Sequence, residues 1–165
     1  MTRTTAGPRD QSELEKRDDV LVFTSNELKG ELEVTGPVRV ILYAASTAQD
    51  TDWTAKLVDV HPDGRALNLC DGILRARYRS SRSHPSLITP GQVYRYEIDL
   101  WATSNAFLPG HRIRVEISSS NFPRFDRNPN TGESFGTGTR LVQATQTVFH
   151  DKEYPSHILL PIIPQ

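Results

Sequence analysis

The chain has 165 residues, of which 36% are hydrophobic and 24% charged, and its formal net charge is -1. This length fits one domain whose core is large enough to fold without cross-links. Charges of both signs are interspersed, so we expect neither nucleic acid nor membrane as a partner. No run approaches the ~20 apolar residues of a membrane span. Residues 1–7 lack the apolar core of a secretory signal, which predicts a cytoplasmic protein if the chain is complete as given.

The first 19 residues are polar and charged, and we expect residues 1–19 to form a lead-in arm before a single domain, residues 20–165. From residue 20 onward, apolar and polar residues alternate. This pattern places one face of a strand against a core and the other toward water. The predicted strands number about ten: 20–24, 32–35, 38–45, 54–60, 66–70, 73–79, 93–100, 112–117, 142–149 and 158–162.

Turn residues separate these strands. Pro62-Asp63-Gly64 can close a hairpin, because glycine supplies the positive φ that a tight turn requires. Asp71-Gly72, Pro90-Gly91 and Pro109-Gly110 mark further reversals. Strands with one apolar face bury it most simply by packing as two facing sheets. The number of strands favours an all-β jelly-roll β-sandwich.

One segment matches a catalytic pattern. Gly132-Glu133-Ser134-Phe135-Gly136 fits the G-x-S-x-G sequence around the nucleophile of α/β-hydrolases, and Asp151 and His157 follow in the order of their triad. The pattern needs a strand that enters the serine turn and a helix that leaves it. Polar loop residues stand on both sides here. We therefore predict no catalytic residue in this chain. A minimal esterase that uses Ser134, Asp151 and His157 is kept as a hypothesis to test.

Candidate metal ligands are sparse, and no metal site is predicted. Asp50 and Asp52 lie near a strand start, as in some calcium sites, although solvated turn residues are the commoner case. The single cysteine, Cys70, excludes an intramolecular disulfide, and its apolar surroundings predict a buried structural thiol. The histidines show no closely spaced pair and are expected to be ordinary loop or rim residues: His61, His84, His111, His150 and His157.

Two groups of aromatic residues are candidates for binding surfaces. Trp53 and Trp101 each adjoin a predicted strand, and either can serve as a sugar-stacking platform or pack in a core or between domains. The loop 118–132 mixes aromatic and charged residues, which is typical of interfaces. Alternatively, Asp126 pairs with a neighbouring arginine and braces the loop internally. The interface candidates in this loop are Phe122, Arg124, Phe125, Asp126 and Arg127.

Several blocks, in order along nearly the whole chain, resemble one known family. The blocks are residues 7–11, 17–21, 32–38, 50–60, 62–66, 71–79, 108–113, 118–132 and 155–158. They are similar to the C-terminal domain of the acyl esterases of the cocaine-esterase and glutaryl-acylase type (CocE/NonD), which are related to the X-Pro dipeptidyl-peptidases.

This resemblance implies a jelly roll of galactose-binding type that packs on a preceding α/β-hydrolase domain. The Ser-His-Asp triad of the family lies in that preceding domain, so no triad position can be carried over to this chain. The implied function is a non-catalytic accessory domain of a serine hydrolase that acts on acyl esters, amides or X-Pro dipeptides. No cofactor is implied, and contacts within a homo-oligomer are a further role. The alternative function is a free-standing carbohydrate-binding module.

Overall fold

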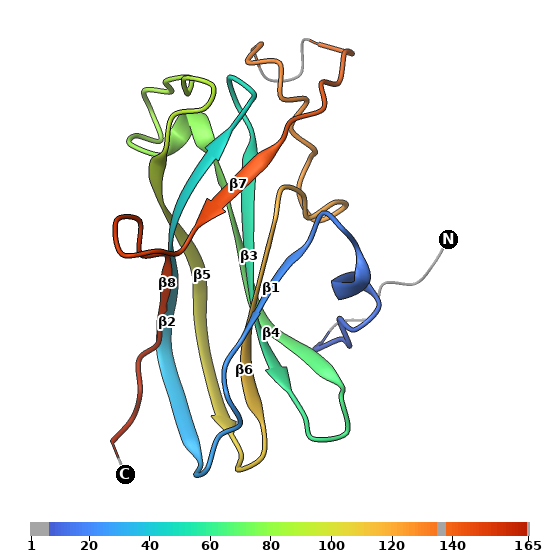
Figure 1. The fold of residues 1–165 in the computed structure, drawn as a ribbon, viewed down its shortest axis with the longest axis vertical. Coiled ribbons are helices and arrows are strands. Elements are labelled where there is room, and N and C mark those ends of the chain that lie inside the picture. Colours follow the sequence, from blue (N-terminus) through green and yellow to red (C-terminus); the bar gives the residue numbers. More distant parts are fainter. Residues whose placement is uncertain (1–6, 135–137, 165) are drawn as a thin grey trace.

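The computed structural model describes residues 7–134 and 138–164. It is a sandwich of two four-stranded antiparallel sheets (Figure 1). The first sheet has the order β1-β6-β3-β4, with β1 (Leu21–Thr24), β6 (Arg112–Ser118), β3 (Asp52–Val60) and β4 (Ala66–Arg75). The second has the order β5-β2-β7, with β8 also paired to β2; its strands are β2 (Leu32–Ser46), β5 (Tyr94–Phe107), β7 (Gln146–Phe149) and β8 (His157–Leu159).

Helical structure within the described residues is limited to two short 3-10 turns, η1 (Leu14–Lys16) and η2 (Ala76–Tyr78). The chain passes repeatedly from one sheet to the other, as in a jelly roll, so the predicted all-β sandwich is confirmed. A search of the described residues for a helix long and apolar enough to cross a membrane finds none.

The strands are fewer than predicted, because two pairs of predicted strands are continuous. Segments 32–35 and 38–45 join into β2, whose register against β5 shifts between Pro37 and Arg39. An irregularity of this kind is where a strand tolerates proline, which has no N–H to donate. Segments 66–70 and 73–79 join into β4, which continues through Gly72 and ends before η2. The expected reversal at Asp71-Gly72 was therefore wrong.

The hydrophobic core lies between the sheets. The alternation of apolar and polar residues in β5 decides which of its side chains enter that core. Tyr96, Ile98 and Leu100 are fully buried, whereas the intervening Glu97 and Asp99 are exposed. Side chains that share this core come from both sheets: Val34, Val38, Leu42, Trp53, Leu57 and Phe107. Because these side chains come from strands of both sheets, their packing holds the two sheets together.

The described part of the predicted lead-in arm packs on the sandwich; residues 1–6 lie outside the described residues. Gln11 is only 5% exposed. Its backbone N–H donates to the Ala66 carbonyl at 2.7 Å, and its Oε1 accepts from Lys56 Nζ at 2.8 Å. Arg9 N donates to Asn68 Oδ1 in the same region. These contacts lay the segment along the β3–β4 hairpin.

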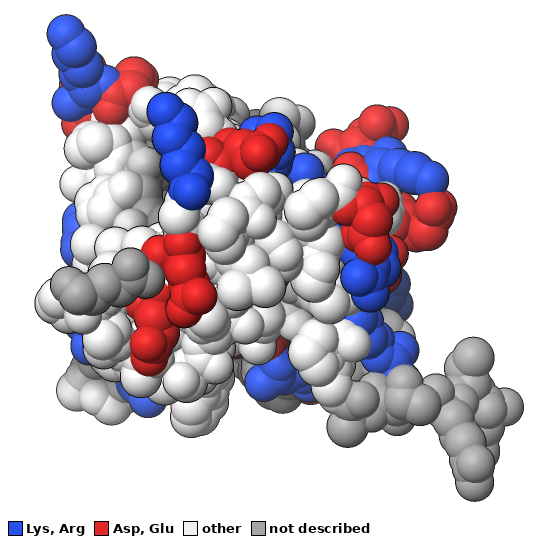
Figure 2. All heavy atoms as spheres, turned by 90° about the horizontal axis from the view of Figure 1, so that it is seen from below, with Lys and Arg blue, Asp and Glu red and all other residues white. Residues whose placement is uncertain are grey.

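Charged side chains do not gather into one field on the face seen from below. Acidic and basic groups are interleaved around its rim, and uncharged residues cover its centre (Figure 2). This distribution agrees with a formal net charge of -1. Among the described residues on this face, no basic stripe of the kind that attracts nucleic acid is seen.

Candidate functional site

Buried ion pairs at the start of β3 form the base of the candidate site. Asp50 and Asp52 are 0% and 1% exposed. Arg77 Nε donates to Asp50 Oδ2 at 2.7 Å. Arg75 donates to Asp52 from Nε at 2.8 Å and from Nη2 at 3.0 Å. Each buried carboxylate thus has a guanidinium partner, which burial of a charge requires. The two aspartates are neither solvated turn residues nor arranged as calcium ligands.

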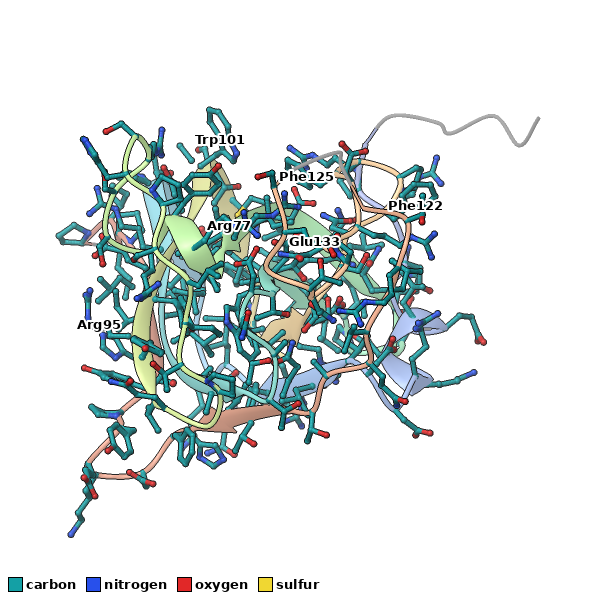
Figure 3. The ribbon with its side chains drawn as sticks, turned by 90° about the horizontal axis from the view of Figure 1, so that it is seen from above. Arg77, Arg95, Trp101, Phe122, Phe125 and Glu133 are labelled. Carbon is teal, nitrogen blue, oxygen red and sulfur yellow. The ribbon has the colours of Figure 1, made fainter. Side chains whose placement is uncertain are left out.

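Asn128 joins the long loop after β6 to this ion-pair network. Its Nδ2 lies 3.0 Å from Asp50 Oδ2 and 3.0 Å from Asp52 Oδ1. Farther along the loop, the Glu133 carbonyl accepts from Arg77 Nη2 at 2.8 Å, and Figure 3 shows these two residues side by side. The sequence analysis missed Asn128, because a single loop amide carries no periodic or spacing signal.

A second anchor ties the loop to β4. Asn121 Nδ2 donates to Asp71 Oδ2 at 2.6 Å, and Arg124 pairs with the other oxygen of the same carboxylate. The predicted internal brace placed Arg124 or Arg127 against Asp126. In the structure, the ion pair of Arg124 instead runs to the strand, so the loop is fixed to the sheet at both ends of its aromatic segment.

Between the two anchors, the loop presents aromatic rings to the surface. Phe122 is 64% exposed, and Phe125 is half-buried. The guanidinium carbon of Arg127 lies 5.6 Å from the centre of the Phe122 ring, and that of Arg124 lies 5.3 Å from the centre of the Phe125 ring. Such cation–π contacts hold the arginines against the rings. The result is a mixed aromatic and cationic surface on a fixed loop.

Trp101 lies on the same side of the molecule as Phe122 and Phe125 (Figure 3). It is 70% exposed and has a φ of 68°, a region that costs a non-glycine residue about 1–2 kcal/mol. The backbone N–H of Trp101 donates to Asp99 Oδ1 at 2.8 Å. A strained, solvent-exposed tryptophan points to a role beyond folding. The name edge surface is used below for these six residues: Trp101, Phe122, Arg124, Phe125, Asp126 and Arg127.

Trp53, the other candidate for a sugar platform, has no exposed ring face. It is 1% exposed, and its ring packs 5.7 Å from that of Tyr96 between the sheets. A stacking platform must present a ring to solvent. Of the two tryptophans, only Trp101 therefore remains a candidate for sugar stacking.

A shallow hollow adjoins the edge surface. It has a volume of about 220 Å³ and is lined by Phe125 and Asp126 of the loop together with Asp52, Ile73, Arg75 and Tyr78. Sites that enclose small ligands usually span about 300–1,000 Å³. The size and the loop aromatics fit the contact surface of a protein partner better than a pocket for a small molecule.

Ser134 of the hypothetical minimal esterase lies apart from Asp151 and His157, which lie in the short connection from β7 to β8 and at the start of β8. Ser134 is exposed in an irregular segment, and Phe135 and Gly136 of its motif lie outside the described residues. Asp151 Oδ1 accepts from the backbone N–H groups of Glu153 and Tyr154, and His157 Nδ1 lies 2.7 Å from the Pro155 carbonyl. In Figure 1, the segment before β7 stands at the top, whereas β8 lies lower, beside β2.

Residues 2–159 match the family described as the X-Pro dipeptidyl-peptidase C-terminal non-catalytic domain. The chain belongs to this family. It is 52% identical, over 95% of its own length, to a cocaine esterase from Rhodococcus sp. (strain MB1 Bresler). This confirms the resemblance seen in the sequence and the prediction of a non-catalytic C-terminal domain. The described positions of Ser134, Asp151 and His157 fit that assignment.

Solved structures share the fold closely. An aminopeptidase from the marine sediment archaeon Thaumarchaeota archaeon superposes with a TM-score of 0.90 at 37% identity, covering 95% of this chain and 28% of its own. An alpha-amino acid ester hydrolase gives a TM-score of 0.90 at 36% identity, covering 94% of this chain and 27% of its own. The chain likewise spans 28% of the Rhodococcus esterase. These similar proteins are thus larger hydrolases, of which the domain matches a small part.

Proposed function

We propose that this domain packs through the edge surface on an α/β-hydrolase domain, which it stabilises and whose active-site mouth it helps to shape. The observation that carries the proposal is the exposure of two large aromatic side chains, Trp101 at 70% and Phe122 at 64%, on one side of the sandwich. Exposed aromatic rings gathered on one side of a domain are typical of an interaction site. The family description as a non-catalytic domain supports this division of labour.

Burial of these rings supplies a driving force for the proposed packing. Covering the exposed part of one ring removes on the order of 100–150 Å² of surface from water, which contributes about 3 kcal/mol at ~25 cal/mol per Å². The arginines that lie over Phe122 and Phe125 add directed donors around the rings. Aromatic and arginine side chains are the groups that most often dominate binding at interfaces.

The chemistry belongs to the partner domain in this proposal. The names of the similar proteins include an esterase, an ester hydrolase and an aminopeptidase. A serine hydrolase acting on acyl esters or amides is therefore the proposed parent, with a Ser-His-Asp triad outside this chain. The domain itself needs no cofactor for a packing role.

A domain graft tests the proposal. The matching C-terminal part of the Rhodococcus cocaine esterase is replaced with this chain, and the melting temperature and ester hydrolysis of the chimera are measured. We expect an active chimera. Trp101→Ser combined with Phe122→Ser is expected to lower the melting temperature of the catalytic domain by several degrees. The isolated chain carrying the same substitutions keeps its own stability, since both rings are mostly exposed there.

Leu159→Ser provides the matched control, because Leu159 is 48% exposed on β8, away from β5 in the second sheet. The control chimera is expected to behave like the unsubstituted one. Equal melting temperatures for the doubly substituted and unsubstituted chimeras would refute the edge surface as the contact. Sedimentation of the isolated chain shows in addition whether a second copy occupies that surface.

Sugar binding is a second candidate, and it rests on the open ring of Trp101 alone. Carbohydrate platforms combine such a ring with hydrogen-bonding groups around it. Calorimetry of the chain with galactose and lactose tests this candidate. Binding that is lost in Trp101→Ser would support it, whereas no heat of binding at millimolar sugar would remove it.

A further inference from the structure

Three potential metal ligands meet where β3 ends and β6 begins, away from the edge surface. Asp59, His61 and His111 each offer a ligand atom, and these atoms lie within 4.8 Å of one another. His111 Nδ1 is 2.8 Å from Asp59 Oδ1, and His61 Nε2 is 3.7 Å from Asp59 Oδ2. The centres of the two imidazole rings are 4.4 Å apart.

Strand pairing creates this cluster. Asp59 is opposite Ile113, and Val60 is opposite Arg112, in the antiparallel ladder of β3 and β6. The next step of the same register brings His61 and His111 together at the end of the ladder. The sequence could not reveal the pair, because the two histidines belong to segments whose register is unknown before folding.

Backbone hydrogen bonds hold both histidines in place. His61 N donates to the Arg65 carbonyl across the β3–β4 turn at 2.8 Å. His111 N donates to the Leu108 carbonyl at 3.1 Å in the turn before β6. Ligands carried on such fixed turns need little reorganisation to bind an ion, which favours affinity.

The surroundings of the cluster suit a cation. Asp59 and His111 are 6% and 7% exposed, whereas His61 is half-buried and faces a hollow of about 320 Å³. Two arginines line that hollow, but their charges are compensated: Arg112 pairs with Glu27 and Arg114 with Glu15. The hollow gives an ion a path to the ligands and leaves room for a water molecule.

We propose that Asp59, His61 and His111 form a binding site for a divalent transition-metal ion of the zinc class. Two imidazoles and one carboxylate are ligands that zinc accepts, and a water molecule from the hollow completes a tetrahedron. Bonds of about 2.0–2.1 Å place tetrahedral ligand atoms roughly 3.3 Å apart. His111 Nδ1 lies 2.8 Å from Asp59 Oδ1, His61 Nε2 lies 3.7 Å from Asp59 Oδ2, and the three ligand atoms are within 4.8 Å of one another, so side-chain rotations bring them to this spacing.

Binding at these atoms changes the tautomer of His111. The 2.8 Å separation of His111 Nδ1 from Asp59 Oδ1 is that of a hydrogen bond, in which the carboxylate accepts. A metal ion at Nδ1 takes the place of this hydrogen bond, and the imidazole then carries its ring proton on Nε2. Binding therefore exchanges the contact between His111 and Asp59 for two metal–ligand bonds, with no net loss of a proton from the ring.

Calorimetric titration of the tag-free, chelator-treated chain with zinc chloride tests the site. We expect one zinc ion per chain and no comparable binding of magnesium. His61→Ala and Asp59→Asn are each expected to weaken zinc binding roughly tenfold or more. His84→Ala is the control, since His84 is exposed and lies in the turn after η2; it should bind as the unsubstituted chain does.

Circular dichroism of each variant confirms that it is folded before titration. His61 is half-buried at the rim, so His61→Gln serves as a milder variant if His61→Ala unfolds. Zinc affinity that is equal in His61→Gln and His84→Ala would overturn the proposal. The absence of any saturable zinc binding by the unsubstituted chain would overturn it as well.

Discussion

The carbonyl oxygen of Asp99 in β5 fills the space beside Gly72 in β4. A Cβ atom built on Gly72 would stand 2.0 Å from that oxygen and 2.8 Å from its carbon. β4 and β5 are edge strands of different sheets. The backbones of the two sheets therefore touch at this point, which closes the sandwich directly beside Trp101 and the edge surface.

Gly72→Ala is expected to destabilise the domain by about 3 kcal/mol or more, because backbone atoms must shift to admit the methyl group. The free energy of unfolding in urea gives the measurement. Gly30→Ala is the matched control, since a Cβ at Gly30 meets nothing within 4 Å. We expect the control to change stability by less than about 0.5 kcal/mol. Equal free energies of unfolding for the two variants would show that the sheets can move apart at Gly72 without loss of stability.

Asp52→Ala is expected to lower the free energy of unfolding by about 3–5 kcal/mol. The substitution leaves the guanidinium of Arg75, whose side chain is 18% exposed, without the carboxylate that neutralises it. The control is Glu97→Gln in the exposed cluster with Arg39 and Arg95, where surface ion pairs contribute about 0–1 kcal/mol.

Proteolysis adds a local readout to Asp52→Ala. Asn128 bonds to Asp50 and Asp52 together, so the loop that it anchors should open more often in the variant. Faster cleavage within residues 118–132 is expected, whereas cleavage elsewhere should follow the global stability alone. A variant that is as stable and as resistant as the unsubstituted chain would contradict the anchoring role.

The sequence predicted the sandwich because strands such as β5 have one buried face, which leaves an alternating pattern in the sequence. The alternation of Tyr96, Ile98 and Leu100 with charged neighbours is a local signal, and β5 forms where that signal stands. The joining of two predicted strands at Gly72 was not predictable, because glycine is read as a turn unless its cross-sheet neighbour is known. Here, that neighbour is the carbonyl of Asp99.

The candidate site was predicted in part. The aromatic and charged composition of the loop indicated Phe122, Arg124 and Phe125 as interface candidates, which stays a prediction, and both rings make cation–π contacts with arginines of the loop. The partner of Arg124 was missed, because Asp71 lies in a strand far from the loop in sequence. Trp53 and Trp101 looked alike in the sequence, since each adjoins a strand. Which of them faces the core depends on register, which the sequence alone does not give.

Cys70 is expected to react slowly with iodoacetamide in the folded domain. Burial raises the pKa of its thiol to about 11, with a further contribution from the charge of Asp71. An unperturbed thiol has a pKa of about 8.5. At pH 8, the reactive thiolate is therefore roughly a hundredfold or more rarer in the folded chain than in the unfolded one.

Mass spectrometry follows this alkylation with time, in buffer and in concentrated urea. The rate in urea sets the reference for an accessible thiol of the same sequence. A rate in buffer that is within threefold of the rate in urea would show that the half-buried thiol is not desolvated.

Glu116 is expected to make the domain less stable as the pH rises above the acidic range. Desolvation raises the pKa of this carboxyl despite Lys56, whose Nζ lies 3.2 Å from Glu116 Oε2, and the charge of Glu15 raises it further. A raised pKa means that the folded state holds the proton more tightly than the unfolded state does. The resulting stabilisation is fully present below the unfolded pKa of about 4.3 and is lost as the pH rises through the folded value.

Glu116→Gln isolates this contribution, because glutamine resembles the protonated carboxyl at every pH. The free energy of unfolding of the variant minus that of the unsubstituted chain should increase from about pH 4.3 upward, and then level off above the folded pKa. Glu97→Gln supplies the control, since Glu97 has a side-chain exposure of 43%. A difference that instead decreases with rising pH would mean that the attraction of Lys56 outweighs desolvation, and that Glu116 stabilises the sheet as an ion pair.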